Sequence, residues 1–196
     1  MKKNTFIIGF VLCLVAVLGF SNQILPNRGN LVMKGDHSYD VNNPYETVGN
    51  GDYVFVALIE EELGNNYPNL RETHDGLKGG DFPFSEYSIT VIDNIKGKLK
   101  KNQSIELSVL GGITYDQKST VTYEGLALPE VGKYYIIVAN GDPNLGLVAV
   151  NSNTVIELPY DNKSDIISSK EYKDYMKYYK DEVKIERKRF GTEFDE

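Results

Sequence analysis

Histidine and cysteine, which often serve as catalytic bases, nucleophiles and zinc ligands, are scarce in this chain of 196 residues. The sequence has two histidines, His37 and His74, and a single cysteine, Cys13. Too few ligands are therefore present for a structural zinc site of the cysteine–histidine type. A Ser-His-Asp triad would need one histidine as its base, but His74 and the following Asp75 lie in a glycine-rich stretch typical of an ordinary polar loop. We expect no catalytic residue, no metal and no cofactor.

Carboxylates offer another route to hydrolysis. Two carboxylates that face each other across a cleft at about 5–10 Å can act as an acid–base pair, and the pair that we consider is Glu61 with Asp93. Glu61 is part of the acidic run Glu60 to Glu62, however, and such a run is typical of a solvated strand end. A carboxylate-dependent hydrolase is therefore the last of our alternatives.

Four lysines gather in the stretch IDNIKGKLKK, namely Lys96, Lys98, Lys100 and Lys101. The pattern favours a hairpin in which Gly97 makes the turn and the lysines lie at its solvated end. Charged side chains at such a position also discourage unwanted pairing of strand edges. The alternative is a site for an anionic partner, so the four lysines are kept as a candidate interaction surface.

Tyr134 and Tyr135 in LPEVGKYYIIVAN are the second candidate for an interaction surface. Barrels of the oligonucleotide/oligosaccharide-binding (OB) type can use aromatic side chains as stacking platforms. Neighbouring residues of a strand point to opposite faces. We therefore expect one of the two tyrosines to lie in the core and the other to be available to a ligand.

The N-terminus carries the clearest targeting signal. Met1-Lys2-Lys3 is followed by the apolar run FIIGFVLCLVAVLGF, residues 6–20. A short basic region before an apolar run marks export, although the run is short for a membrane-spanning helix, which needs about 20 residues. Residues 1–21 are therefore predicted to be a signal peptide or an N-terminal membrane anchor. The chain is expected to be secreted or anchored to the membrane, and an exported part without cysteine fits a bacterial protein.

The charge balance argues against a nucleic acid partner. The formal net charge of the chain is −7, and without residues 1–21 the remainder holds 19 basic and 28 acidic side chains. A duplex would be repelled by this excess of acid. The expected partner is therefore an extracellular protein or a cell-surface polymer, and contact with a membrane is expected only through residues 1–21.

The remaining chain divides into a linker, a β-domain and a helix. Residues 22–50 are polar and rich in asparagine and glycine, which predicts a linker. Residues 51–160 show short period-two segments separated by turn residues, which predicts strands. These strands are expected at 52–62, 86–95, 104–110, 119–123 and 133–139, with one kinked strand or two strands over 146–158. Residues 165–191 follow helical spacing, which predicts one amphipathic helix that begins near Ser168 and stops at Gly191.

Short strands with a helix at one end predict a mainly β fold, a small antiparallel OB-like β-barrel with a C-terminal helix. The strand that ends in IKGKLKK, the next strand SIELSVL and the later LPEVGKYYIIVAN together resemble the bacterial relatives of the netrin-like module, the barrel of tissue inhibitors of metalloproteinases. The resemblance covers about residues 52–158 and implies the barrel alone. Inhibitors of that family act through a cysteine at the mature N-terminus, and no cysteine follows Cys13.

These patterns favour a non-enzymatic interaction module at the bacterial cell surface. An oligosaccharide- or wall-polymer-binding barrel is the first alternative, and the hydrolase is the second. A groove lined by exposed tyrosines would favour the sugar binder. An exposed apolar patch would favour a protein partner.

Overall fold

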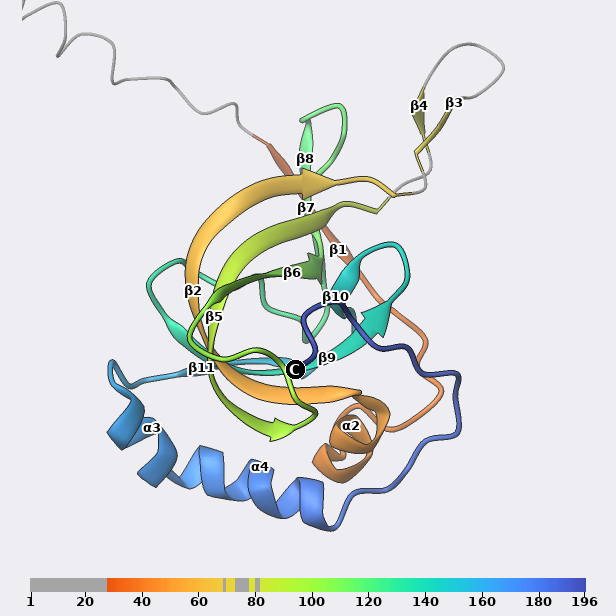
Figure 1. Ribbon diagram of the computed structural model, residues 1–196. Coiled ribbons are helices and arrows are strands. Elements are labelled where there is room, and N and C mark those ends of the chain that lie inside the picture. The colour runs from red at the N-terminus through yellow and green to blue at the C-terminus, as the bar shows by residue number, and fades with distance from the viewer. Residues whose placement is uncertain (1–27, 69, 73–77, 80–81) are drawn as a thin grey trace, which may run out of the picture.

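The computed structural model describes residues 28–68, 70–72, 78–79 and 82–196 (Figure 1). The predicted export segment, residues 1–21, lies outside the described residues, and so does His74. Among the helices of the described chain, none is long and apolar enough to cross a membrane.

Five strands form a closed ring. They are β2 (Tyr53–Asn66), β5 (Phe84–Lys96), β6 (Ser104–Leu110), β9 (Tyr134–Asp142) and β10 (Gly146–Ala149). Strand β2 pairs with β5 and β9, β5 pairs with β6, and β10 closes the ring by pairing antiparallel with β9 and parallel with β6. Strand β11 (Val155–Leu158) pairs antiparallel with β9 on the edge opposite β2, next to the β10 pairing. In chain order the ring therefore runs first, second, third, fifth, fourth, which confirms the predicted OB-like barrel.

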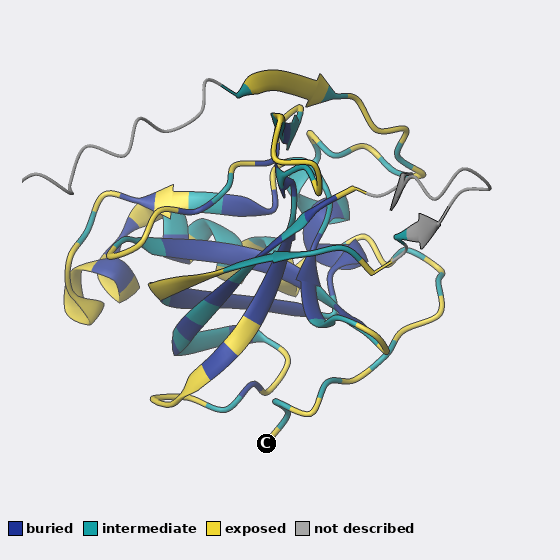
Figure 2. Cartoon of the chain, turned by 90° about the horizontal axis from the view of Figure 1, so that it is seen from above, coloured by how far each residue is buried: buried dark blue, intermediate teal, exposed yellow. Residues whose placement is uncertain are grey.

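The alternation of strand β2 explains why it is apolar on both faces. Tyr53, Phe55, Ala57 and Ile59 lie in the inner core, with the inward residues of the other barrel strands. The intervening Val54 and Val56 lie in a second core, between the barrel and the helices. Period-two alternation thus buries both sides of one strand, and buried residues run through the barrel in Figure 2. The prediction of a central barrel strand at 52–62 is confirmed.

The prediction of a linker over residues 22–50 is wrong for two segments. Strand β1 (Gly29–Met33) pairs parallel with β8 (Ser119–Tyr123), which also pairs with β7 (Gly112–Ile113), and these three strands form a small separate sheet. Helix α2 (Pro44–Asn50) precedes the barrel, and its Val48 is fully buried. The side chain of Asn43 caps α2 by accepting from the N–H of Tyr45 at 3.1 Å. The domain therefore begins before residue 50.

The connection between β2 and β5 is shorter than predicted. Strand β2 continues to Asn66 and β5 begins at Phe84, so both strands extend beyond the predicted ranges 52–62 and 86–95. The connection contains the short strands β3 (Arg71–Glu72) and β4 (Lys78–Gly79). The predicted strands at 104–110 and 119–123 are confirmed, and residues 146–158 form two strands, not one.

The prediction of one helix over 165–191 is also wrong. Two helices, α3 (Lys163–Ser168) and α4 (Lys170–Lys180), are separated at Ser169. The side chain of Ser169, not of Ser168, caps α4 by accepting from the N–H of Tyr172 at 3.1 Å. Beyond Lys180 the chain is extended and returns across the barrel, because its side chains find partners there that a continued helix would not reach.

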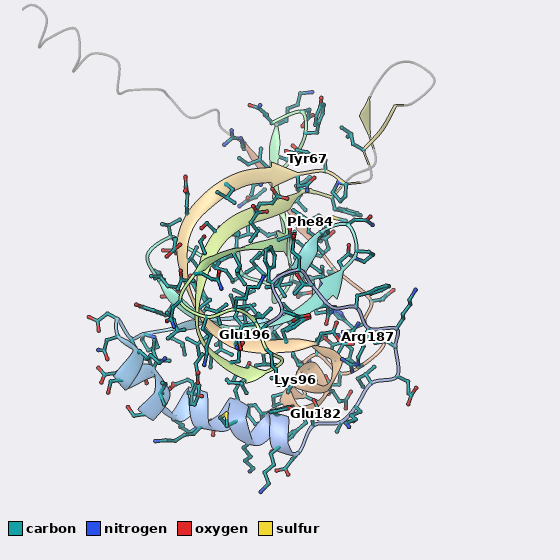
Figure 3. The ribbon with its side chains drawn as sticks, in the orientation of Figure 1. Tyr67, Phe84, Lys96, Glu182, Arg187 and Glu196 are labelled. Atoms are coloured by element: carbon teal, nitrogen blue, oxygen red, sulfur yellow. The ribbon has the colours of Figure 1, made fainter. Side chains whose placement is uncertain are left out.

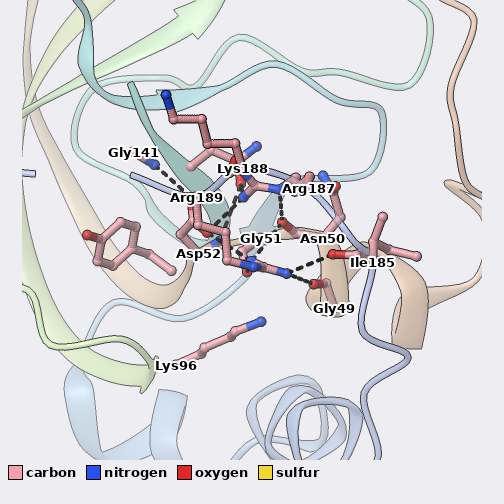
Figure 4. Close-up of polar contacts among 12 residues, drawn as sticks. Gly49, Asn50, Gly51, Asp52, Lys96, Gly141, Ile185, Arg187, Lys188 and Arg189 are labelled. Carbon is pink, nitrogen blue, oxygen red and sulfur yellow. Dashed lines mark hydrogen bonds and ion pairs between the residues drawn. The ribbon is translucent and has the colours of Figure 1, made fainter. Parts of the chain in front are cut away.

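This extended tail, residues 181–196, closes one end of the barrel. Asp52 forms ion pairs with Arg187 and Arg189, both at 2.8 Å, and its side chain is only 7% exposed. We call Asp52, Arg187 and Arg189 the clamp, and Figure 4 shows them together. Arg189 also donates to the carbonyls of Gly49 and Gly51. The tail is therefore held by charges and by main-chain groups together.

The last residues of the tail form main-chain hydrogen bonds with the β5–β6 connection. The N–H of Lys100 donates to the carbonyl of Phe194 at 2.9 Å, and the N–H of Glu196 donates to the carbonyl of Lys98 at 2.8 Å. The hydroxyl of Tyr53 donates to Asp195 at 2.9 Å. Figure 3 shows Glu196, Lys96 and Arg187 at this closed end, with Tyr67 and Phe84 near the other end.

Two glycines make room for the tail. A Cβ atom at Gly49 would collide with the carbonyl oxygen of Val183, and one at Gly141 would collide with the carbonyl oxygen of Phe190. Both obstructions are main-chain atoms, which cannot turn aside as a flexible side chain can. The close approach of the two segments therefore requires glycine at these positions.

Candidate functional site

The four lysines of the β5–β6 turn do not together form a site for an anionic partner. Lys96 is partly buried, pairs with Glu182 at 2.6 Å and donates to the carbonyl of Val48 at 2.8 Å. Lys100 donates to the carbonyl of Glu193 at 2.8 Å. Lys101 forms an ion pair with Asp93 of β5 at 3.5 Å. Three of the four thus bind the chain itself, and Lys98 is exposed.

Burial changes the proton affinity of Lys96. Desolvation lowers the pKa of this amine, and the hydrogen bond to Glu182 opposes the change. The pair lies where the tail leaves α4, since Glu182 follows the end of that helix by two residues. Lys96 therefore holds the tail in place, which the sequence pattern did not indicate.

Neither predicted tyrosine offers an open stacking platform. Tyr135 is 2% exposed and lies in the inner core, where its hydroxyl accepts from the N–H of Glu130 at 2.9 Å. Tyr134 is partly buried and packs against the second core. The structure places the pair on opposite faces of β9, as expected, but both faces are occupied.

The structure does not bring the proposed acid–base pair together. In the β2–β5 ladder Glu61 lies opposite Ser88, whereas Asp93 lies opposite Val56. These two positions of β5 are five residues apart, which corresponds to about 16 Å at about 3.3 Å per residue. Asp93 instead accepts a hydrogen bond from Tyr172 at 2.6 Å. In the described part of the chain, no three histidine, cysteine or acidic side chains are grouped as metal ligands.

His37 lies beside a serine, in a polar hollow of about 320 Å³ lined by Gly35, His37, Val41, Asn42, Glu124, Gly125, Ser152 and Asn153. Its Nε2 is 3.3 Å from the hydroxyl of Ser152, which donates to the carbonyl of Glu124. A general base must accept the proton of the nucleophile. In this arrangement the Ser152 hydroxyl donates to the carbonyl of Glu124, so His37 is not placed as a base toward it.

Exposed apolar and aromatic side chains gather around the small sheet at the opposite end of the barrel from the tail. We call this surface the rim, and it consists of Leu31, Val32, Tyr67, Phe82, Tyr115 and Tyr123, of which Tyr67 and Tyr123 are partly buried and the other four exposed. Strand β1 contributes the first two residues, the β2–β5 connection the next two, and the β7–β8 hairpin with β8 the last two.

Two aromatic pairs hold the β2–β5 connection to the small sheet. The rings of Tyr67 and Tyr115 meet edge to face with centroids 5.4 Å apart, and those of Phe82 and Tyr123 do so at 5.9 Å. The hydroxyl of Tyr67 donates to the carbonyl of Ile113 at 2.7 Å. Burial raises the pKa of both Tyr67 and Tyr123. The rim is therefore an ordered surface, with each end of the connection fixed.

Strand β1 is exposed on both faces. The side chain of Leu31 is 48% exposed and that of the neighbouring Val32, on the other face, is 65% exposed. Figure 2 shows β1 as a strand that lies apart from the buried barrel. The strand therefore contributes little to either core, and its apolar side chains remain available.

The side wall of the barrel has a different character. On β5 and β6, Thr90 donates to Glu60 at 2.7 Å, and the hydroxyls of Ser88 and Ser104 are 2.6 Å apart. None of the large exposed hydrophobic side chains of the described chain lies on either strand. This wall is the face on which OB barrels bind oligomers, and here it presents hydroxyls and acids.

The sequence analysis did not predict the rim, because residues 22–50 were interpreted as a linker and β1 was not recognised as a strand. Two signals were available. The stretch Leu31-Val32-Met33 is a short apolar run that could have indicated β1, and Asn43-Pro44 followed by Glu46 has the residue types of a helix start, which could have indicated α2. The aromatic contacts join distant parts of the chain, and no local pattern predicts such pairs.

The fold and the rim define a class, an OB-like barrel with one closed end and one apolar end. No model of a known protein family matches the chain, and no curated protein sequence matches it.

Proposed function

We propose that the protein is an exported, non-enzymatic interaction module that binds a protein partner through the rim. The single observation that carries this proposal is the rim itself, an ordered set of apolar and aromatic side chains, four of them exposed, on a molecule with an acidic net charge. Surfaces of this kind mark protein interaction sites. Export rests on the N-terminal sequence pattern, and the relation to netrin-like modules stays a prediction.

The rim supports a protein partner better than a wall polymer. Sugar binders present aromatic faces along a groove, whereas the aromatic rings of the rim are packed against one another in edge-to-face pairs. The tyrosines predicted for stacking lie in packed environments. The hydrolase alternative loses its proposed pair because Glu61 and Asp93 lie at distant positions of the β2–β5 ladder.

Site-specific photo-crosslinking in the native cell tests the proposal. A photoreactive residue is placed at Val32 or Phe82 in the rim, and at the exposed Glu106 of the side wall as the matched control. The expected result is a discrete protein adduct from both rim positions and none from Glu106. Equal labelling at all three positions would contradict the proposal. Adducts with polysaccharide alone would favour the wall-polymer alternative.

A further inference from the structure

The outer edge of β1 carries unpaired main-chain groups. The N–H of Gly29 donates to a carbonyl beside β8 at 2.9 Å, and the carbonyl of Met33 accepts from the N–H of Glu124 at 2.9 Å. In a parallel pair, residues bonded to the neighbour alternate with residues whose N–H and C=O point away from it. The main-chain groups of Asn30 and Val32 therefore point to the outer edge, where no strand of the described chain pairs with β1.

This edge lacks the features that usually protect an exposed strand. Natural edges carry charged residues, proline or a bulge, or are covered. The stretch GNLVM of β1 has no charge and no proline, its pairing with β8 is regular over all five residues, and its side chains are mostly exposed. An edge of this kind is a template for strand addition.

We propose that the outer edge of β1 binds, as an added strand, an extended apolar segment of a partner protein that carries a carboxylate facing Arg28. This inference rests on the proposed function and names the chemistry of its partner. Because both faces of β1 are exposed, an added strand can place apolar side chains beside Leu31 on one face and beside Val32 on the other. An uninterrupted apolar segment therefore fits better than an alternating one.

The charge of Arg28 determines which residue the partner segment should carry where it lies beside the start of β1. Arg28 directly precedes β1, and its Nε donates to the carbonyl of Gln117 at 3.2 Å. Within the described chain Arg28 forms no ion pair, whereas Lys34, beyond the other end of β1, pairs with Glu124 at 3.3 Å. A carboxylate on the incoming segment would supply the ion pair that this guanidinium lacks among the described residues.

The same charges argue against a second copy of this chain. Antiparallel pairing of two β1 strands about Leu31 would bond Asn30 to Val32 of the other copy, but it would also set Arg28 opposite Lys34 of that copy. Like charges directly opposite each other on paired strands are destabilising.

Val32→Pro is the substitution that separates strand addition from folding. Proline removes the N–H of Val32, which points to the outer edge, and leaves the bonds that Gly29 and Met33 make toward β8. Proline also restricts the preceding residue to extended conformations, and Leu31 is already extended in β1. Val32→Thr keeps the N–H and the β-branch and is the matched control.

The experiment uses the full chain and two short valine-rich peptides, one with glutamate at both ends and one with lysine at both ends. Binding is measured by fluorescence anisotropy. The expected result is a preference of about tenfold or more for the glutamate peptide, which Arg28→Glu reverses, since about 1.4 kcal/mol corresponds to tenfold in affinity. Val32→Pro weakens binding by about tenfold or more, as expected for the loss of an edge hydrogen bond and the obstruction by the ring. Val32→Thr binds within about threefold of the parent.

Equal binding of the parent and Val32→Pro would overturn strand addition. Equal binding of the two peptides would overturn the selection of a carboxylate by Arg28. A dimer in sedimentation analysis that Val32→Pro abolishes would overturn the choice of partner in favour of a second copy. If neither peptide binds while the photo-crosslinks from Phe82 persist, strand addition fails and the proposed function stands. If those crosslinks are also absent, the proposed function fails with it.

Discussion

The clamp around Asp52 is expected to hold the C-terminal tail on the barrel, and Asp52→Asn tests this directly. The carboxylate accepts from Arg187 and Arg189 and, through its second oxygen, from the N–H of Gly141 at 3.1 Å. Asparagine has one oxygen and one NH₂ group in place of two acceptor oxygens. It therefore loses an acceptor and turns a donor toward an arginine or an N–H.

The size of the effect follows from the burial of the three groups. Hydrogen bonds to charged groups contribute about 1.5–3 kcal/mol each. Both arginines are partly exposed and keep bonds to main-chain carbonyls, so solvent screening reduces the loss. We expect a decrease in the free energy of unfolding of about 2–3 kcal/mol. For a chain of this size the decrease corresponds to a Tm lower by about 4–12 °C.

Two assays report on this prediction. Urea unfolding followed by circular dichroism gives the stability, and trypsin cleavage after Arg187, Lys188 or Arg189 reports on tail docking. Glu106→Gln, at an exposed position of β6, is the control and should change stability by less than about 0.5 kcal/mol. If Asp52→Asn matches this control in stability and in cleavage rate, the clamp does not hold the tail.

Three further predictions concern the packing of the tail, of the inner core and of helix α4. Gly141→Ala should speed trypsin cleavage of the tail, because the added methyl group meets its main chain, whereas Gly35→Ala makes only ordinary contacts and should not. Burial raises the pKa of Tyr87 from 10 to about 12. The unfolded chain loses this proton at lower pH than the folded chain, so stability should fall as pH rises from 10 to about 12, more steeply than in Tyr87→Phe. Tyr172→Phe removes the 2.6 Å bond to Asp93 and should cost about 1–2 kcal/mol in urea unfolding; an unchanged midpoint would show that the apolar contacts of α4 suffice.

The barrel could be predicted from the sequence because its information is local. Alternation in SIELSVL and in YSITVI identifies an inward and an outward face without knowledge of the neighbouring strand. The double apolar pattern of β2 likewise showed that both of its faces are covered. Pairing order was not local, and the parallel contact of β10 with β6 that closes the ring is not readable from either segment.

The tail could not be predicted because its conformation depends on distant partners. Helical spacing continues past Lys180, and mixed charges at i and i+4 suit a helix surface. The extended conformation wins because Arg187 and Arg189 reach Asp52 and the carbonyls of the segment that leads into β2. No local pattern distinguishes Gly49 and Gly141 from other glycines, because the tail that requires them lies far along the chain.

The two ends of the barrel differ in what covers them, and this difference supports the rim as the binding surface. One end is filled by the tail, with Phe194 packed against the inner core, and helices α2 and α4 pack together beside it (Figure 1). The wall of β5 and β6 carries hydroxyls and acids that already bind one another. The small sheet instead keeps Leu31 and Val32 exposed on a strand that neither core requires. Among the described residues no segment covers the outer edge of that strand, and we expect the chemistry of this edge to determine which partner binds there.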